Sequence, residues 1–336
     1  MYRIPNNTEK ATKHYERYAE KVRDSVKVYW EGQSESFKKN YTGRFLNDIA
    51  NTDVSKTGSG SILRTLLTGD FNEQKALINK IDADLKLAEA DNPGEKDVFY
   101  KFCRRLFVDD FYGNNKYFLK NNHIEAVGID VCPYCGRSYI YVVNHPTKSN
   151  DETKVKPQID HFLPKSVYPY LALNYYNLIP SCSTCNEAPC KRENDPIGQD
   201  RSHEYLMQPY EFRTEDIVFE YIPTTSFYED FSVGVDMKCA NSELDKGYKE
   251  WLALDKLYEK HNRIVTRMYV QLESIVADKY NGYLKDKFKV PSSFMKDVPN
   301  MIFGYDLKDE EAPYTTLHKF RKDIFRQIKN DISDNT

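Results

Sequence analysis

Residues 132–142 read CPYCGRSYIYV, and the stretch SCSTCN follows at residues 181–186. Each stretch holds two cysteines that are separated by two residues: Cys132 and Cys135, then Cys182 and Cys185. Two such pairs offer four thiolates from two tight turns, which is the donor set of a tetrahedral structural zinc site. One pair alone would also suit a redox site, but two pairs that bracket a β-prone segment favour zinc. The sequence therefore predicts one structural zinc ion between these turns.

The other three of the seven cysteines have different interpretations. Cys103 and Cys239 lie in apolar runs, so we expect them in the core. Cys190 follows the second pair by five residues and is an alternative zinc ligand. In a reducing compartment, paired cysteines indicate a metal site more often than a disulfide.

Composition narrows the class of protein. Of the 336 residues, 40% are hydrophobic and 14% aromatic, which is too many for a disordered chain. The net charge is only −3 although 29% of residues are charged, so any surface for nucleic acid must come from local clustering. The polar start lacks the apolar segment of a signal peptide, and no apolar run approaches the roughly 20 residues of a membrane helix. We expect a soluble, cytoplasmic protein without a membrane partner.

The hydrophobic pattern and the residue types along the chain suggest three regions in an α+β protein. Residues 1–130 are predicted to be helical, residues 131–210 contain the cysteine pairs, and residues 211–336 are predicted to be mostly helical. Residues 55–61, SKTGSGS, are interpreted as a linker, because they lack the Lys-Ser/Thr ending of a phosphate-binding loop.

Hydrophobic periodicity gives an expectation for individual elements. Strands are expected at 138–143 and 155–159, as a hairpin, and at 216–222 and 231–239, with a short helix near Cys185. Helices are expected at 9–31, 61–90, 254–275 and 315–332. The helix at 254–275 would place His261 in the core, and the basic helix at 315–332 is either a solvated face or a surface that follows phosphates.

Three short motifs follow the first cysteine pair. They read IDHFLPKS at 159–166, NLIPSC at 177–182, and Cys-Asn at 185–186. With CPYCG they closely resemble the HNH or ββα-metal nuclease family, in the variant that ends in asparagine and carries a four-cysteine zinc frame. The resemblance covers about residues 131–210, including LMQPY at 206–210. It implies a ββα-metal core between the two helical regions.

The resemblance also implies a role for each motif residue. Hydrolysis of a phosphodiester needs a base to activate water and a cation to stabilise negative charge. His161 would be the base, since an unperturbed histidine has a pKa of about 6.5 and is largely neutral in the cytoplasm. Asp160 points the opposite way along the strand and would hold a divalent ion, with Asn186 as the second oxygen ligand. Asn177 would fix the backbone of the histidine loop.

The cofactors and nucleic-acid contacts follow from the same resemblance. The catalytic ion would be magnesium, with manganese as an alternative, and the zinc would be separate and structural. Lys165 and Lys191 are the candidate phosphate contacts.

The layout of helices on both sides of the motif region is similar to the stand-alone HNH nucleases of bacterial antiphage defence, such as the nuclease subunit of Septu-type systems. That likeness implies a DNA endonuclease with an ATPase partner from the same locus. Two alternatives stay open: a nuclease that cleaves RNA such as tRNA, and a catalytically silent zinc module that binds nucleic acid or a partner.

Overall fold

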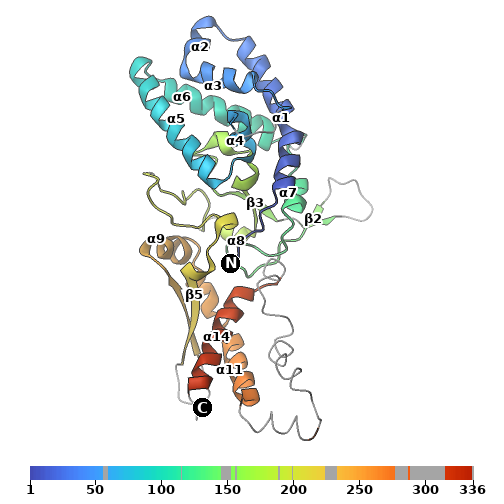
Figure 1. Ribbon diagram of the computed structural model, residues 1–336, viewed down its shortest axis with the longest axis vertical. Coiled ribbons are helices and arrows are strands. Elements are labelled where there is room, and N and C mark those ends of the chain that lie inside the picture. The colour runs from blue at the N-terminus through green and yellow to red at the C-terminus, as the bar shows by residue number, and fades with distance from the viewer. Residues whose placement is uncertain are drawn as a thin grey trace.

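The computed structural model describes residues 1–55, 60–114, 116–144, 153–155, 157–187, 190–198, 200–223, 233–276, 287 and 315–334. The molecule is elongated (Figure 1). Helices of the N-terminal region form one end, the segments around β3 and α8 lie in the middle, and β5, α11 and α14 form the other end. Among the described residues, no helix combines the length and apolar character that crossing a membrane requires.

Helices form the N-terminal region. They are α1 (Thr8–Glu31), α2 (Glu35–Lys39), α3 (Tyr41–Ala50), α4 (Ile62–Thr68), α5 (Phe71–Asp91) and α6 (Glu95–Cys103). Helix α1 begins where the Asn7 side chain accepts a hydrogen bond from the Lys10 backbone N–H, which satisfies one of the free donors of the first turn. Its buried face, which includes Tyr15, Val22 and Val26, packs against α3 and α4. The expected helix at 9–31 is confirmed.

The single helix expected at 61–90 is wrong, because the chain breaks between α4 and α5. Asp70 caps α5 by accepting from the Glu73 N–H, and the Glu73 carboxylate accepts from the Asp70 N–H. This reciprocal capping box defines a helix start that the hydrophobic pattern alone does not reveal.

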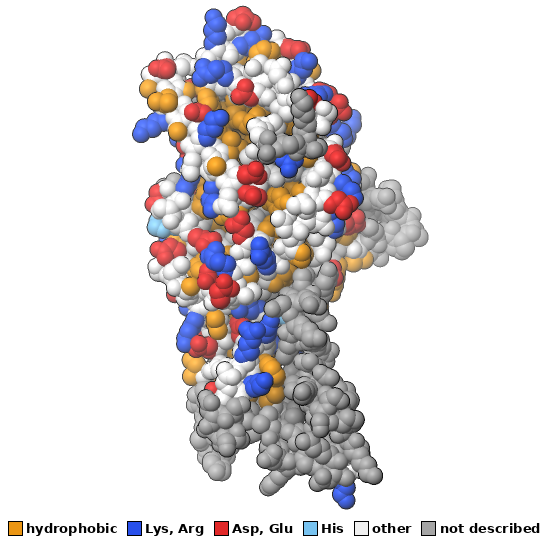
Figure 2. Space-filling model, in the orientation of Figure 1, with side chains coloured by type: hydrophobic (Ala, Val, Ile, Leu, Met, Phe, Trp, Pro, Cys, Tyr) orange, Lys and Arg blue, Asp and Glu red, His pale blue; other side chains and the backbone are white. Residues whose placement is uncertain are grey.

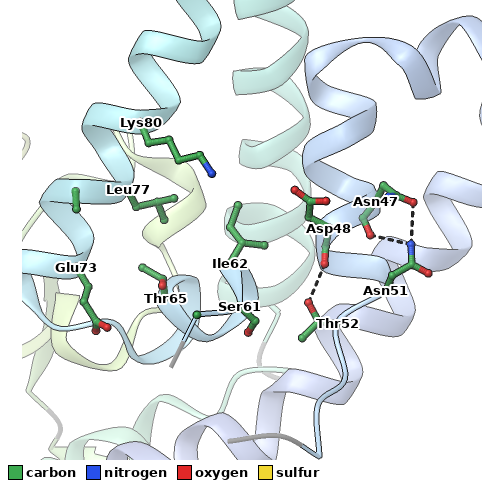
Figure 3. Close-up of a pocket in the computed structure, with 12 residues that line it drawn as sticks. Asn47, Asp48, Asn51, Thr52, Ser61, Ile62, Thr65, Glu73, Leu77 and Lys80 are labelled. Carbon is green, nitrogen blue, oxygen red and sulfur yellow. Dashed lines mark hydrogen bonds between the residues drawn. The ribbon is translucent and has the colours of Figure 1, made fainter. Parts of the chain in front are cut away.

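A cavity of about 640 Å³ opens between α3, α4 and α5 (Figure 3). Asn47 of α3 and Asn51, directly after α3, line it on one side, and Glu73 and Lys80 line it from α5. The Asn51 amide donates to both the backbone and the side-chain oxygen of Asn47, so these polar groups of the lining are already hydrogen-bonded to each other.

A π-helical segment, η1 (Arg104–Tyr112), continues directly from α6. Such segments are rare in proteins and are frequent at functional positions. Phe107, Phe111 and Tyr112 are buried on it. Helix α7 (Lys120–Val127) follows and ends at Gly128, whose φ of 67° is the left-handed conformation that favours glycine.

The expected hairpin of the central region forms only at its inner end, where Val143 pairs with Val155. β1 (Val143–Asn144) pairs with β2 (Thr153–Val155), whereas β3 (Gln158–His161) pairs with the later strand β4 (Leu178–Ser181). The β-prone run at 138–143 therefore contributes only its last residue to a named strand. The short helix α8 (Ser183–Asn186) begins directly after β4, close to its expected position. The short helical turns in and after this region are η2 (Pro169–Leu171), η3 (Tyr175–Asn177), η4 (Pro209–Glu211) and η5 (Thr214–Asp216).

The C-terminal region contains the two further expected strands. β5 (Ile217–Pro223) and β6 (Val233–Cys239) are antiparallel and pair from Ile217 with Cys239 to Pro223 with Val233. The helices that follow are α9 (Ser242–Asp245), the π-helical η6 (Lys246–Trp251), α10 (Leu254–Glu259), α11 (Asn262–Val276) and α14 (His318–Asp334).

Helix α14 lies along β5 (Figure 1). The Phe219 N–H donates to Asp323 Oδ2 at 3.1 Å, and Gln327 bonds both the N–H and the C=O of Tyr221, at 2.9 and 3.1 Å. Lys319 on the same helix is only 8% exposed and pairs with Asp323 at 2.8 Å. The basic helix is therefore not simply a solvated face, because its inner side is bonded to the strand.

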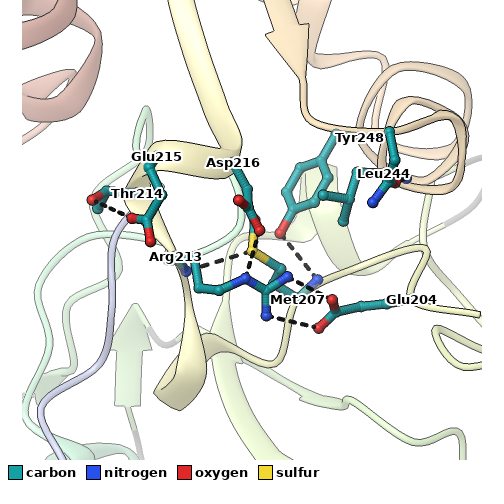
Figure 4. Close-up of polar contacts among 9 residues, drawn as sticks. Glu204, Met207, Arg213, Thr214, Glu215, Asp216, Leu244 and Tyr248 are labelled. Atoms are coloured by element: carbon teal, nitrogen blue, oxygen red, sulfur yellow. Dashed lines mark hydrogen bonds and ion pairs between the residues drawn. The ribbon is translucent and has the colours of Figure 1, made fainter.

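An arginine joins the segment before β5 to its neighbours (Figure 4). Arg213 pairs with Glu204 at 2.6 Å and with Asp216 at 2.5 Å. The hydroxyl of Tyr248, from η6, accepts a hydrogen bond from the Met207 N–H at 3.3 Å. The bond from Met207 to Tyr248 joins the LMQPY segment to η6 of the C-terminal region.

His261 does not lie in the core of one long helix. It falls between α10 and α11 and is only partly buried, and its Nε2 accepts a hydrogen bond from Arg137 Nε at 3.1 Å. Because the chain breaks between α10 and α11, His261 does not lie on the buried face of one helix. It lies beside the first cysteine turn.

Candidate metal centre and active site

The four paired cysteines form one cluster. Cys132 and Cys135 lie in a turn after Val131, which bridges to Tyr139, while Cys182 caps α8 and Cys185 lies within it. All four side chains are buried, and their sulfur atoms lie within 4.8 Å of one another. The Sγ atoms of Cys135 and Cys182 are 3.9 Å apart. Cys190 is not part of this cluster.

The cluster fits a zinc ion. In a tetrahedral site with Zn–S bonds of about 2.3 Å, the sulfur atoms are roughly 3.8 Å apart. The four thiols hydrogen-bond with one another, which lowers the pKa of Cys135 and Cys182, while the pKa of Cys132 and Cys185 is raised. A bound cation would stabilise all four as thiolates. The two cysteine turns come from segments almost fifty residues apart, and a bound ion would join them.

Remote segments converge on the first cysteine turn. The Tyr258 hydroxyl, from α10, donates to the Cys135 carbonyl at 2.5 Å, and the Leu317 N–H, just before α14, donates to the Gly136 carbonyl at 2.6 Å. The Tyr2 hydroxyl donates to the Val131 carbonyl. The cysteine cluster therefore lies where the first residues of the chain and two C-terminal elements meet.

The β3–β4 pair positions the candidate active-site residues. Asp160 lies opposite Ile179 and His161 lies opposite Leu178. Side chains alternate along a strand, so Asp160 and Gln158 share one face while His161 projects from the other. Asn186 joins the Asp160 face, because its Nδ2 donates to Gln158 Oε1 at 2.7 Å.

Asp160 is enclosed in a polar network. It is 2% exposed, and the ammonium of Lys191 lies 3.0 Å from each of its carboxylate oxygens. The Tyr134 hydroxyl donates to Oδ2 at 2.5 Å. Lys191 is completely buried and also donates to the His161 carbonyl at 2.9 Å. Because a buried charge requires a partner, this pair is a structural unit.

The Asp160 and Asn186 pair does not fit a magnesium ion in this arrangement. Both oxygens of the single carboxylate face the Lys191 ammonium, and a cation in the same place would be repelled by it. Magnesium also needs several oxygen ligands in an open, octahedral site, whereas the Asp160 carboxylate is buried.

His161 is buried and electrically neutral. Its ring centroid lies 4.5 Å from that of Tyr112 in an edge-to-face contact, and its Nε2 lies 3.1 Å from the Ala172 carbonyl. A carbonyl only accepts, so Nε2 carries the proton and Nδ1 has the lone pair. Burial, reinforced by Lys165, Lys191 and Lys120, lowers the pKa of His161 well below 6.5.

Two residues outside the motif region take part in this environment. Tyr112 ends η1, and the ammonium groups of Lys120 and Lys165 lie 4.6 and 5.7 Å from the centroid of its ring. These distances are within the range of cation–π contacts. Neither residue was among the predicted site residues. Tyr112 lies in an aromatic-rich run at 98–113, VFYKFCRRLFVDDFYG, and Lys120 has no comparable signal in its local sequence.

Asn177 braces the loop after β3. Its Oδ1 accepts from the Leu163 N–H at 2.7 Å, and its Nδ2 donates to the carbonyls of Leu163 and Leu171 at 3.1 and 3.2 Å. The backbone carbonyl of Asn177 accepts from the Phe162 N–H at 2.9 Å. The side chain thus fixes the segment that follows His161, although a role for Asn177 in catalysis stays a prediction.

The predicted site residues fall into two groups. Asp160, His161, Asn177 and Lys191 are gathered in the buried centre, with Asn186 on the Asp160 face. Lys165 is exposed at the rim. On the face shown in Figure 2, acidic and basic side chains are interspersed.

Comparisons with known proteins give one short similarity. Over 36 residues, 11% of this chain, the sequence is 50% identical to the Septu protein PtuB of Bacillus thuringiensis. The matched stretch is 14% of that relative's length. No protein-family model matches the chain, and no solved structure matches it.

Proposed function

We propose that this protein is a zinc-stabilised endonuclease of the HNH type that hydrolyses phosphodiester bonds of DNA. The observation that carries the proposal is the pairing of β3 with β4. Strand β3 holds His161 next to Asp160, and Asn177 braces the loop that follows β3. Strand β4 leads directly into the second cysteine turn. With zinc bound to the four cysteines, this frame would give the rigid placement that a hydrolytic site requires.

His161 is proposed as the general base. The ring is neutral, and its Nδ1 lone pair can accept a proton from water. Tyr112 lies against the ring and both residues are largely buried, so substrate access requires Tyr112 to move. Lys120 and Lys165 beside Tyr112 would attract the phosphate groups of the substrate.

Magnesium, or manganese in its place, belongs to this proposal only through the family resemblance. Asp160 and Asn186 would be its ligands, and the Lys191 ammonium would have to leave Asp160 first. We assign no step of hydrolysis to the ion.

A role in bacterial antiphage defence is proposed from the 36-residue similarity to Septu protein PtuB, together with the four-cysteine cluster. An ATPase encoded beside the gene would be the partner. This part of the proposal rests on the likeness of the helical layout to the nuclease subunit of Septu-type systems.

The test is a cleavage assay with plasmid DNA, single-stranded DNA and total RNA, each with and without magnesium. We expect cleavage of DNA that is lost in His161→Ala, and the samples without magnesium test whether cleavage depends on the ion. Cleavage of RNA alone would replace the proposed substrate with RNA.

A second candidate function is favoured by the burial of the site. Because Asp160, His161 and Lys191 are closed off by their own contacts, the chain could be a zinc module that binds nucleic acid or a partner without cleaving it. Nucleic-acid binding without cleavage under every condition of the assay would support this candidate.

A further inference from the structure

Tyr112 connects the proposed base to the surface of the molecule. Its ring lies edge-to-face against that of His161, with the centroids 4.5 Å apart. The same ring is contacted by the ammonium groups of Lys120 and Lys165, which lie 4.6 and 5.7 Å from its centroid. His161 is 5% exposed and Tyr112 is 8% exposed, whereas Lys165 is an exposed residue. Tyr112 therefore joins a buried imidazole to a lysine at the rim.

Hydrogen bonds hold the other contacts of His161. Its Nε2 donates to the Ala172 carbonyl at 3.1 Å, and its own carbonyl accepts from Lys191 at 2.9 Å. Lys191 in turn is paired with the buried Asp160. Opening the site at these places would leave buried polar groups without partners, which is costly. Moving the Tyr112 ring breaks aromatic and cation–π contacts only with His161 and the lysines, and it leaves the hydrogen bonds of His161 in place.

The position of Tyr112 in the chain suits such a movement. It is the last residue of the π-helical η1, and Gly113 follows it. Hinges occur at the ends of elements, where a few backbone torsions absorb the change. Phe107 and Phe111 are buried and anchor the rest of η1. The Tyr112 ring can therefore leave His161 through a change at the end of η1 while the preceding turns stay packed.

The two lysines that contact Tyr112 are also suitable partners for phosphate. An ammonium group binds a phosphate oxygen in a charge-assisted hydrogen bond, which is stronger than a contact with an aromatic ring. A phosphate group therefore competes with Tyr112 for each lysine. The two nitrogens can be separated by no more than the sum of their distances to the one centroid. Phosphates of one DNA strand follow one another about every 3.4 Å along the helix axis, so one strand can supply a phosphate to each lysine.

We propose that Tyr112 is a specificity-determining cover on His161, which is released when phosphates of one nucleic-acid strand draw Lys120 and Lys165 away from its ring. The cover restricts the site to polynucleotides. A small diester has one phosphate, which must lie at the base and leaves none for the lysines. This inference rests on the proposed nuclease function and adds to it a physical reason for the choice of substrate.

The first test compares plasmid DNA with bis(p-nitrophenyl) phosphate, a diester that has a single phosphate. The wild-type chain should cleave DNA and leave the small diester intact. Tyr112→Ala should hydrolyse the small diester at least about tenfold faster than the wild type, because the ring contacts that close the site are lost. Tyr112→Phe keeps the ring and should match the wild type. Equal rates on the small diester for Tyr112→Ala and the wild type would overturn the proposal.

The second test measures the cover without any cleavage. Diethyl pyrocarbonate acylates accessible imidazoles, and peptide mass mapping at one fixed pH gives the rate for each histidine. His161 should react at least about tenfold faster in Tyr112→Ala than in the wild type, with the partly exposed His203 as the internal reference in each sample. An inactive protein that shows this difference would contradict the nuclease function and leave the cover standing. An active protein that lacks the difference would refute the cover alone.

The lysines provide a further test that leaves the aromatic core untouched. Lys120→Ala and Lys165→Ala should each raise the acylation rate of His161 about two- to fivefold, as expected for the loss of one cation–π contact. Lys38→Ala is the matched control, because Lys38 makes a cation–π contact with Trp30 at 4.8 Å. Inorganic phosphate, compared with chloride at the same ionic strength, should raise the rate in the wild type but not in the double variant Lys120→Ala/Lys165→Ala. A wild-type rate that phosphate leaves unchanged or lowers, or single variants that react like the wild type, would overturn release by phosphate.

Discussion

The ammonium of Lys191 lies 3.0 Å from both carboxylate oxygens of Asp160, and neither side chain is more than 2% exposed. Removing one partner of such a pair leaves an uncompensated buried charge, which typically costs about 3–5 kcal/mol. We therefore expect Lys191→Met to lower the free energy of unfolding by roughly that amount in a urea titration. The double variant Asp160→Asn/Lys191→Met should recover most of the loss. A single variant as stable as the wild type would show that the pair is not closed to water.

The cysteine cluster predicts a metal content that can be measured. The purified protein should contain about one zinc ion per chain, and Cys132→Ser or Cys185→Ser should lose it together with cooperative unfolding, because the binding energy of structural zinc is folding energy. Cys190→Ser is the matched control and should keep its zinc. A stable wild-type protein without zinc would contradict this assignment.

The two motif asparagines should separate stability from activity. Asn177→Ala removes three buried hydrogen bonds and should destabilise the fold by about 1–3 kcal/mol or more. Asn186→Ala removes one partly buried bond to Gln158, so its stability should stay within about 1 kcal/mol of the wild type while cleavage falls. Full cleavage by Asn186→Ala at saturating magnesium would exclude this residue as a ligand of the proposed ion.

His161→Ala should abolish cleavage and preserve nucleic-acid binding. A general base contributes about 10²–10⁴-fold to the rate, whereas affinity depends on basic side chains such as Lys165. The measurement pairs the cleavage rate with the affinity at one salt concentration. If both are lost and the variant stays folded, His161 is a binding residue instead.

The buried histidines predict a loss of stability in acid. The pKa of His14 is about 3 and that of His123 is about 4, and burial lowers the pKa of His161 as well. Below pH 6.5 the unfolded chain takes up protons that the folded chain does not, so each histidine removes about 1.4 kcal/mol of stability per pH unit. This effect is absent above about pH 7 and continues down to the folded-state pKa.

Urea unfolding at pH 7.5, 6.0 and 5.0 measures that slope, with zinc content determined in the same samples to separate metal release from histidine protonation. His203→Gln is a suitable control, because His203 is partly exposed. A stability that does not change between pH 7.5 and 5.0 would mean that these histidines are not held neutral.

Local sequence signals predicted part of the molecule well. The cysteine spacing predicted the cluster because each pair needs only one tight turn, and alternating apolar residues predicted the strands at β5 and β6. The motif order also placed Asp160 and His161 on a strand. These features depend on residues that are near one another in the chain.

The remaining features depend on contacts across the chain. Strand β3 pairs with β4 rather than with the preceding run. The break at Gly69 and Asp70 is an exception, because its capping box is local, but it lies inside an otherwise continuous apolar pattern. Tyr112 and Lys120 reach the neighbourhood of His161 only through tertiary packing. The burial of Lys191, expected to be a phosphate contact, likewise has no signature in its local sequence.

The bonds from Asp323 and Gln327 to β5 have a consequence for the growing and the truncated chain. A two-stranded sheet offers an open edge that can recruit a strand from another molecule, which is a common route to aggregation. Here helix α14 covers the edge of β5, and this helix begins almost one hundred residues after the strand ends. In a nascent chain, or in a product cut before residue 318, the edge of β5 would be uncovered. C-terminal truncation should therefore favour self-association even where the cysteine cluster is intact.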